Sequence, residues 1–278
     1  MRLHPSIAAM FTIGLVWCAG CGGGAEKAPA VAFAPKASEQ PAKAANAPIE
    51  TGWGDVVGRI VWEGEVPVAG LINLPGNAVC GPVKDETWLI DPKTKGLKNT
   101  FVWLEPLQKG QAIAVHPSLV KIAPATVEVD QPACAFVPHA VALREGQVLV
   151  AKNTSAISHN FKWTGSPVVN PGGNQLIAPT MSVPIGNLKA DRIPIMVECN
   201  IHPWMKGWIR VFDHPYFAVT DDQGRFELKN APAGDFKMKI WNASGGWAGG
   251  AAGKDGRPLT IQSGANALGD IAYPAPAN

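Results

Sequence analysis

Apolar and polar residues alternate in short runs along most of the chain, and this period of two predicts β-strands rather than helices. The alternating segments are 55–64, 99–104, 126–130, 140–143, 148–152, 157–163, 181–185, 192–198, 207–212, 217–220, 225–228, 236–241, 258–261 and 268–271. Stretches rich in Gly and Pro separate them: 165–175 and 243–256 favour loops, and 65–98 favours loops around short strands. No long segment with a helical period occurs outside the N-terminus, so we expect an all-β fold.

The N-terminal segment 1–20 has the features of an export signal. Arg2 supplies a positive charge, and the apolar run 7–17 is too short to cross a membrane. The run ends in Cys18-Ala19-Gly20-Cys21, which resembles the lipobox of bacterial lipoproteins, in which the cysteine after the cleavage site is acylated. Cys18 stands where Leu is more usual, so an ordinary signal peptide cleaved nearby is the alternative. We expect an exported protein, in the periplasm or at the cell surface, with a lipid anchor on Cys21.

Residues 21–52 are rich in Ala, Pro, Lys and Gly and have few large apolar side chains, a composition that predicts a disordered tether. The rest of the 278-residue chain is long enough for two ordinary domains. The net charge is only +2, which argues against a nucleic-acid partner.

Three of the five cysteines, Cys80, Cys134 and Cys199, lie in the part that we expect to fold outside the cytoplasm. An odd number of thiols in an oxidising compartment needs an explanation. A Cys80–Cys134 disulfide together with a metal-bound Cys199 supplies one. Three unpaired, buried cysteines are the alternative.

Cys199, His202 and Met205 follow one another at intervals of three residues, between the apolar segments 192–198 and 207–212. They offer a thiolate, an imidazole and a thioether, and such soft sulfur and nitrogen donors favour copper, especially Cu(I). A loop this short can direct all three side chains inward only if strands hold both of its ends. A buried structural cysteine with a histidine nearby in the loop is the alternative.

His159 is the best candidate for a ligand from a distant part of the chain, since it lies forty residues before Cys199 in an alternating, apolar segment. Cys199, His159 and His202 would form a plane of one sulfur and two nitrogens, with Met205 as a weak axial ligand. This is the pattern of blue copper sites. We expect Asn160 to hydrogen-bond the backbone of the Cys199 loop and to lock the two ligand segments together.

The order of these motifs resembles that of the cupredoxins, such as plastocyanin, pseudoazurin and amicyanin. The matching residues are Val137-Pro138, Arg144-Glu145-Gly146-Gln147-Val148, Ser158-His159-Asn160 and the Cys199–Met205 loop, in which Pro203 and Trp204 are most similar to amicyanin. The resemblance covers residues 114–212, and the long Pro- and Gly-rich stretch between His159 and Cys199 departs from it.

The cupredoxin resemblance implies a Greek-key sandwich that holds one type 1 copper ion on His159, Cys199, His202 and Met205. It also implies that His202 reaches the surface, ringed by Pro203 and Trp204, and is the exit for electrons. The partner would then be a redox protein such as a c-type cytochrome.

A second resemblance frames the first. Thr220-Asp221-Asp222-Gln223-Gly224-Arg225-Phe226 and Ala231-Pro232-Ala233-Gly234-Asp235-Phe236 are similar to the second half of a carboxypeptidase regulatory-like domain, a transthyretin-like β-sandwich. Residues 53–113 match its first half loosely, and 213–275 would be its second half. This resemblance implies one discontinuous sandwich with the cupredoxin inserted in it and joined to it by the Cys80–Cys134 disulfide. Three consecutive β modules are the alternative.

The sequence argues against an enzyme. Six histidines without any His-x-His pair exclude a multicopper oxidase, and a nucleophile elbow Gly-x-Ser-x-Gly is absent. We expect an electron carrier with one type 1 copper. Two alternatives remain: a surface-attached β-sandwich that binds carbohydrate or protein, with a structural or vestigial copper site, suggested by ten Trp residues, and a copper chaperone or storage protein with a looser site.

Overall fold

The computed structural model describes residues 52–72 and 79–275. The expected export signal 1–20, the lipid anchor on Cys21 and all but the last residue of the tether 21–52 lie outside these residues. The described part of the chain contains strands and two short 3-10 helices, η1 (Pro117–Leu119) and η2 (Gly250–Asp255). None of its helices is long and apolar enough to cross a membrane. The all-β expectation is confirmed for this part of the chain.

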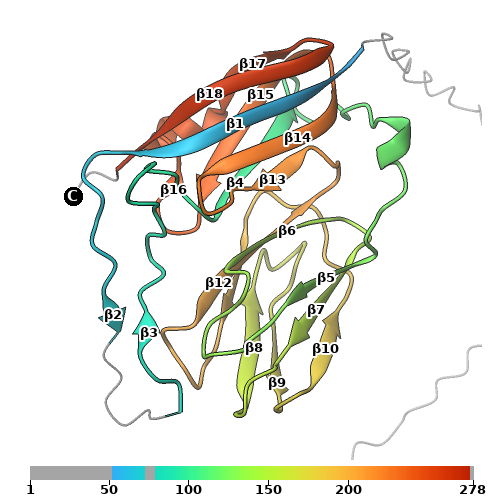
Figure 1. The fold of residues 1–278 in the computed structure, drawn as a ribbon. Helices are drawn as coiled ribbons and strands as arrows, with labels where there is room; N and C mark the ends of the chain where they lie inside the picture. Colours follow the sequence, from blue (N-terminus) through green and yellow to red (C-terminus); the bar gives the residue numbers. More distant parts are fainter. Residues whose placement is uncertain (1–51, 73–78, 276–278) are drawn as a thin grey trace, which may run out of the picture. The chain divides into compact units, whose positions relative to one another are not determined.

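Strands from both ends of the described chain pair with one another and form what we call the host sandwich. Its strands are β1 (Trp53–Glu63), β4 (Thr100–Pro106), β13 (Phe217–Val219), β14 (Arg225–Pro232), β15 (Gly234–Asn242), β16 (Gly246–Trp247), β17 (Arg257–Ile261) and β18 (Gly264–Pro274). One sheet has the order β14-β1-β18, and in Figure 1 the blue β1 lies between the red β18 and the orange β14. The other has the order β13-β4-β15-β16, with β17 also paired to β15.

The residues between β4 and β13 form two sheets of their own, which we call the inserted sandwich. Its strands are β5 (Thr126–Val129), β6 (Ala140–Arg144), β7 (Val148–Lys152), β8 (His159–Thr164), β9 (Gly173–Ile177), β10 (Ser182–Ile185), β11 (Ile195–Glu198) and β12 (Lys206–Phe212). The sheets have the orders β10-β7-β5 and β6-β12-β11-β8-β9. A small hairpin of β2 (Leu71–Ile72) and β3 (Val83–Lys84) precedes β4.

The structure corrects two loop predictions. The predicted loop 165–175 contains the start of β9, and the predicted loop 243–256 contains β16 and η2. β9 has no apolar alternation because most of its side chains are exposed and it lies at the edge of its sheet, paired only with β8. Such a strand is organised by main-chain hydrogen bonds to its neighbour, which leave no periodic signal in the sequence.

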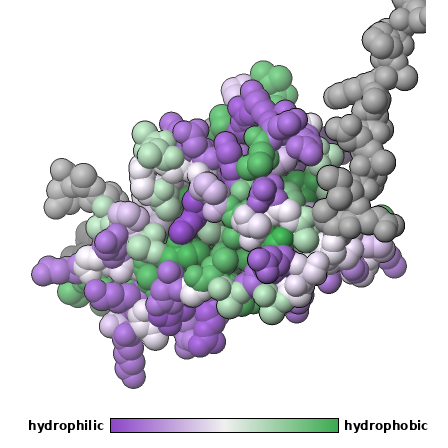
Figure 2. Space-filling model, turned by 90° about the horizontal axis from the view of Figure 1, so that it is seen from above, coloured by the Kyte–Doolittle hydropathy of each residue, from purple (hydrophilic) through white to green (hydrophobic). Residues whose placement is uncertain are grey.

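Each sandwich has an apolar core, and a third, aromatic cluster joins the two. Its buried members are Phe101, Trp103, Ala140, Phe212 and Trp241, which come from β4 and β15 of the host and from β6 and β12 of the insert. Seen from the side of β1, β17 and β18, polar and apolar side chains are interspersed on the surface (Figure 2). The buried cluster therefore fastens the inserted sandwich to the host.

Arg210 is the charged member of this junction. Its guanidinium lies 4.0 Å from the ring centre of Trp103 and 5.1 Å from that of Phe212. Nη1 donates a hydrogen bond to the carbonyl oxygen of Arg192 at 2.8 Å. Burial lowers the pKa of Arg210 to about 10, so the side chain stays charged at neutral pH. The cation–π contacts thus partly replace the water that the charge has lost.

We predict that Gly224→Ala destabilises the fold much more than Gly269→Ala. Both glycines have positive φ, +75° and +67°, so an alanine at either position is strained by about 1 kcal/mol. At Gly224 an added Cβ would also lie 2.2 Å from the carbonyl oxygen of Ile60, whereas at Gly269 it meets nothing within 4 Å. Urea unfolding should show an additional loss of roughly 2 kcal/mol for Gly224→Ala. Equal losses would contradict the close approach.

We predict that metal-free protein loses stability as the pH falls from 6.5 toward 4, in part through His214. The ring is buried, accepts a hydrogen bond from the backbone N–H of Tyr216 at 3.1 Å, and has its pKa lowered to about 4, chiefly by burial. In this window the unfolded chain binds a proton that the folded chain does not, which disfavours folding by up to about 2 kcal/mol at pH 5. His214→Asn should reduce the pH dependence of the unfolding free energy. An unchanged pH dependence would show that His214 does not contribute.

Candidate metal centre

Antiparallel pairing of β8 with β11 brings the two distant ligand segments together. Lys162 faces Glu198 in this register, so the start of β8 lies beside the end of β11. His159 is the first residue of β8, and Cys199 directly follows β11. The backbone N–H of Asn160 donates to Cys199 Sγ at 3.3 Å, which fixes the sulfur against the beginning of β8.

The loop that carries the other candidate ligands is closed at both ends by β11 and β12. Glu198 faces Lys206 in the ladder, and beyond it the N–H of Cys199 donates to the carbonyl oxygen of Met205 at 3.3 Å. The N–H of Met205 in turn donates to the carbonyl oxygen of His202 at 2.9 Å. The loop is thus the tight turn of the β11–β12 hairpin, held at both ends as the sequence predicted. The Met205 side chain is buried in the core of the inserted sandwich.

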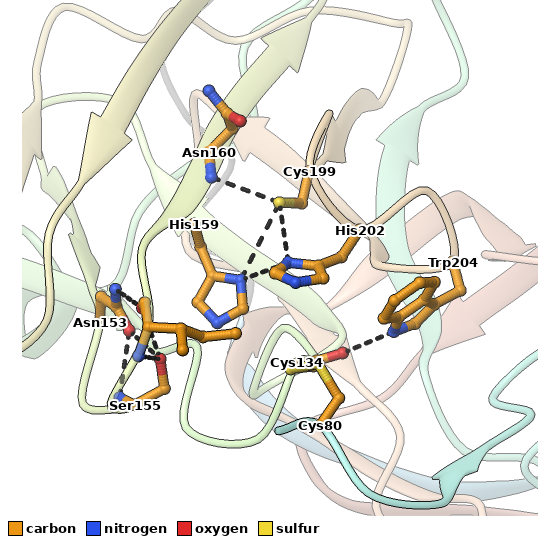
Figure 3. The surroundings of a disulfide bond; sticks show 10 residues. Cys80, Cys134, Asn153, Ser155, His159, Asn160, Cys199, His202 and Trp204 are labelled. Carbon is orange, nitrogen blue, oxygen red and sulfur yellow. Dashed lines mark hydrogen bonds between the residues drawn. A yellow bond between two sulfur atoms is a disulfide. The ribbon is translucent and has the colours of Figure 1, made fainter. Parts of the chain in front are cut away.

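Three donor atoms converge in this place (Figure 3). His159 Nδ1 lies 2.9 Å from His202 Nδ1, and Cys199 Sγ lies 3.9 Å from the first nitrogen and 3.6 Å from the second. All three side chains are buried, with exposed fractions of 0% for His159, 1% for Cys199 and 5% for His202. Cys199 is the free cysteine of the described residues.

The donor spacing fits a trigonal metal site. An ion about 2.0 Å from each nitrogen and about 2.3 Å from the sulfur, lengths typical of zinc, would hold sulfur and nitrogen roughly 3.7 Å apart. The two sulfur–nitrogen distances, 3.6 and 3.9 Å, agree with this value. The nitrogen–nitrogen distance of 2.9 Å is shorter than the roughly 3.5 Å of such a site, so the rings must separate slightly to admit an ion.

Both imidazoles are held in the neutral form that binds metal ions. Burial, and then the neighbouring His202, lowers the pKa of His159 to about 4. Burial also lowers the pKa of His202. A protonated ring would have no lone pair for a metal ion, so at neutral pH no proton has to be displaced from either ring.

Asn160 fixes the site through its main chain, not through its side chain as the sequence suggested. Its side-chain Nδ2 donates to Oδ1 of Asn174 at an exposed position, 3.1 Å away. The reason is the alternation of β8, because His159 points into the core and the next side chain must point to the other face. The link to the Cys199 loop is the backbone hydrogen bond to the sulfur.

Asn153 is a buried residue that sequence reasoning placed only in a loop. Its Nδ2 donates to the carbonyl oxygens of Ile157 and Ile177, and its Oδ1 accepts from the N–H and the hydroxyl of Ser155. These bonds shape the turn that leads into His159. The Asn153-Thr154-Ser155 sequence is typical of such turns and was the available signal.

Cys80 and Cys134 form a disulfide, with a Cα–Cα distance of 5.6 Å, that links the segment before β4 to the inserted sandwich. The indole N–H of Trp204 donates to the carbonyl oxygen of Cys134 at 3.2 Å, so the ligand loop is attached to the disulfide. The expectation that His202 reaches the surface is wrong, because the residue is buried, with an exposed fraction of 5%. The Trp204 ring lies 5.1 Å from it.

The other histidines in the described residues lie outside the donor cluster. His139 approaches Glu86 at 3.3 Å, His116 packs on the Trp53 ring at 4.9 Å, and His214 accepts a hydrogen bond from the N–H of Tyr216 at 3.1 Å. Two groups in the described residues could hold a metal ion: His159 with Cys199 and His202, and Cys80 with Cys134 and His202. The first group contains three of the four ligands that the sequence indicated, and the fourth, Met205, is buried in the same core as Cys199.

No protein-family model matches the chain, and no curated protein matches it either. Solved structures align with part of it. A reduced amicyanin variant has 13% sequence identity and a TM-score of 0.29, over 40% of this chain and 98% of that chain. A purple cupredoxin from Nitrosopumilus maritimus has 16% identity and a TM-score of 0.27, over 31% and 98%. A copper-containing nitrite reductase from Thermus scotoductus has 19% identity and a TM-score of 0.30, over 36% and 27%. Because these values are low, function must be inferred from the site's own side chains.

We predict that Asn153→Ala lowers the free energy of unfolding by about 3 kcal/mol, because two buried carbonyl oxygens lose their donor. Asn160→Ala is the matched control, since it removes only an exposed side-chain bond and should change stability by about 0.5 kcal/mol or less. Urea unfolding of copper-free protein measures both. A large loss for Asn160→Ala would restore the side-chain role that the sequence suggested.

Proposed function

We propose that this chain is a cupredoxin-type, one-electron carrier with a single type 1 copper ion. The observation that carries the proposal is the convergence of Cys199 Sγ and the Nδ1 atoms of His159 and His202 within 4 Å of one another in a buried place. One thiolate and two imidazoles in a plane, with a weak thioether, is the donor set of blue copper electron-transfer sites. Met205 is the proposed thioether ligand, because it closes the same loop and is buried in the same core.

The side chains of the site are suited to electron transfer more than to catalysis. Copper, when bound, would supply a one-electron change between Cu(I) and Cu(II). The chain holds its donors by strand pairing on both sides and excludes water from them, so little has to rearrange when the charge changes. Because all three donor residues are buried, a substrate would have little direct access to an ion held there, which supports the proposal of a carrier.

The proposed place of action is an oxidising compartment outside the cytoplasm. The Cys80–Cys134 disulfide supports it, since structural disulfides are rare in the cytosol of most organisms. The export signal 1–20, the lipid anchor on Cys21 and the tether 21–52 remain predictions. The transthyretin-like, carboxypeptidase regulatory-like identity of the host sandwich is likewise part of the proposal, supported by the strands that its two halves share in both sheets.

A redox protein such as a c-type cytochrome is the proposed partner. Because His202 is buried, the partner would meet the tip of the ligand loop rather than the imidazole itself. Ile201 is 49% exposed at this tip, and Pro203 is exposed beside it. A small apolar contact of this kind suits a transient complex, in which the partners must separate after each electron.

The carbohydrate-binding alternative receives no support from the tryptophans. The nine Trp residues in the described part of the chain are all buried or half-buried. Several pack on other aromatic rings at the junction, such as Trp208 on Trp241 at 5.0 Å and Trp103 on Trp247 at 5.6 Å. Stacking on a sugar requires an exposed ring face, so these side chains are better explained as packing.

We predict that the protein loaded with Cu(II) has an intense visible absorption band from thiolate-to-copper charge transfer. Cys199→Ser should abolish the band, because it removes the sulfur donor. His116→Gln is the control, since this histidine lies outside the cluster and the band should remain. Absorption spectroscopy with metal analysis measures both. A colourless wild-type protein with one bound Cu(II) would refute the proposal.

A further inference from the structure

The disulfide lies directly beside the candidate copper centre. The sulfur atoms of Cys80 and Cys134 and a ring nitrogen of His202 all lie within 4.8 Å of one another. His202 therefore belongs to two groups of donors, and Figure 3 shows its ring between Cys199 and the disulfide. The electron carrier proposed above makes no use of the two disulfide sulfurs.

The surroundings of this second group favour a soft ligand set. Cys134 is buried in the core of the inserted sandwich, and Cys80 and Trp204 pack against the same core. Trp204 also donates to the carbonyl oxygen of Cys134, which keeps this residue in place independently of the disulfide. Few polar groups could compete with sulfur and nitrogen here, and thiolates with imidazole bind Cu(I) and Zn²⁺ in preference to hard cations.

We propose that reduction of the disulfide turns Cys80, Cys134 and His202 into a second binding site, specific for a soft cation, above all Cu(I). In the reduction, a dithiol gives two electrons and two protons to the Cys80–Cys134 bond, which becomes two thiols, and the dithiol closes to its own disulfide. When Cu(I) binds, the two thiols become thiolates and release two protons.

The backbone positions allow this change without a large movement. The Cα atoms of the two cysteines are 5.6 Å apart. Two thiolates on one ion, each at about 2.3 Å, need their sulfurs roughly 4 Å apart, which rotation of the two side chains can supply. A ring nitrogen of His202 already lies within 4.8 Å of both sulfurs, so a small movement would bring three donors to one ion.

The site goes beyond electron transfer and does not require copper at Cys199. Because both groups use His202, an ion held by the reduced cysteines would compete for the imidazole of the candidate type 1 centre. The redox state of the disulfide would then decide whether the chain offers a site for a cycling copper ion or holds Cu(I) on a thiolate-rich one.

The test uses the full chain with Cys199→Ser, which removes the candidate type 1 ligand and leaves the second group complete. The protein is reduced with a trialkylphosphine, which takes up the oxygen of water as it is oxidised and adds no competing thiol, and is then desalted without oxygen. Cu(I) is titrated against a chromophoric chelator. We expect one Cu(I) per reduced chain, with an ultraviolet thiolate-to-Cu(I) band and an affinity at least about 100-fold above that of the oxidised chain.

The matched control is Cys80→Ser in the same Cys199→Ser background, since it also lacks the disulfide but retains only one of the two thiols. It should lose the band and most of the gain in affinity. Near-ultraviolet circular dichroism reports whether each reduced chain stays folded. Equal Cu(I) binding by the oxidised and reduced chains, equal binding by the control, or unfolding on reduction would each overturn the proposal. The presence or absence of the visible band in the wild-type Cu(II) protein tests the electron carrier separately.

Discussion

The site depends on one pairing, that of β8 with β11. These two short strands lie far apart in sequence, and their antiparallel register, which pairs Lys162 with Glu198, brings the start of β8 close to the residue that follows β11. His159 is the first residue of β8 and Cys199 directly follows β11, and the Asn160 N–H completes the contact at the sulfur. If the register slipped by one residue, His159 would face the other side of the sheet and the donor set would be lost. The position of the first ligand is therefore a consequence of main-chain hydrogen bonding.

The host sandwich contributes to the site through contacts as well as connectivity. The aromatic cluster around Trp103 and Phe212 fastens β12, and β12 holds one end of the ligand loop. From the other direction, the Cys80–Cys134 disulfide brings a host segment next to His202. The ligand loop thus lies between two attachments, and this explains why its imidazole is buried where a surface position was expected. An isolated inserted sandwich would lack both attachments, because Trp103 and Cys80 belong to the host part of the chain.

Much of the fold could be read from alternation, because most strands have one face in an apolar core. The strands that were missed, β9 and β16, have no such face or are very short, and only their neighbours define them. Asn160 was predicted beside the ligand loop, but the choice between its side chain and its backbone depends on the pleat of β8. Asn153 was missed because asparagine favours turns whether its side chain is buried or solvated, so the sequence does not distinguish the two cases.

The sequence by itself determined the chemistry of this protein, that is, a thiolate, two imidazoles and a thioether with spacings that allow one loop and one strand to hold them. It also determined the all-β class, because side-chain alternation is a local property of the chain. Only the tertiary structure decided that His202 is buried and that its ring lies next to the disulfide. The physical reason is that burial and proximity depend on the packing of segments distant in sequence, and no local pattern records which surface will cover a given side chain.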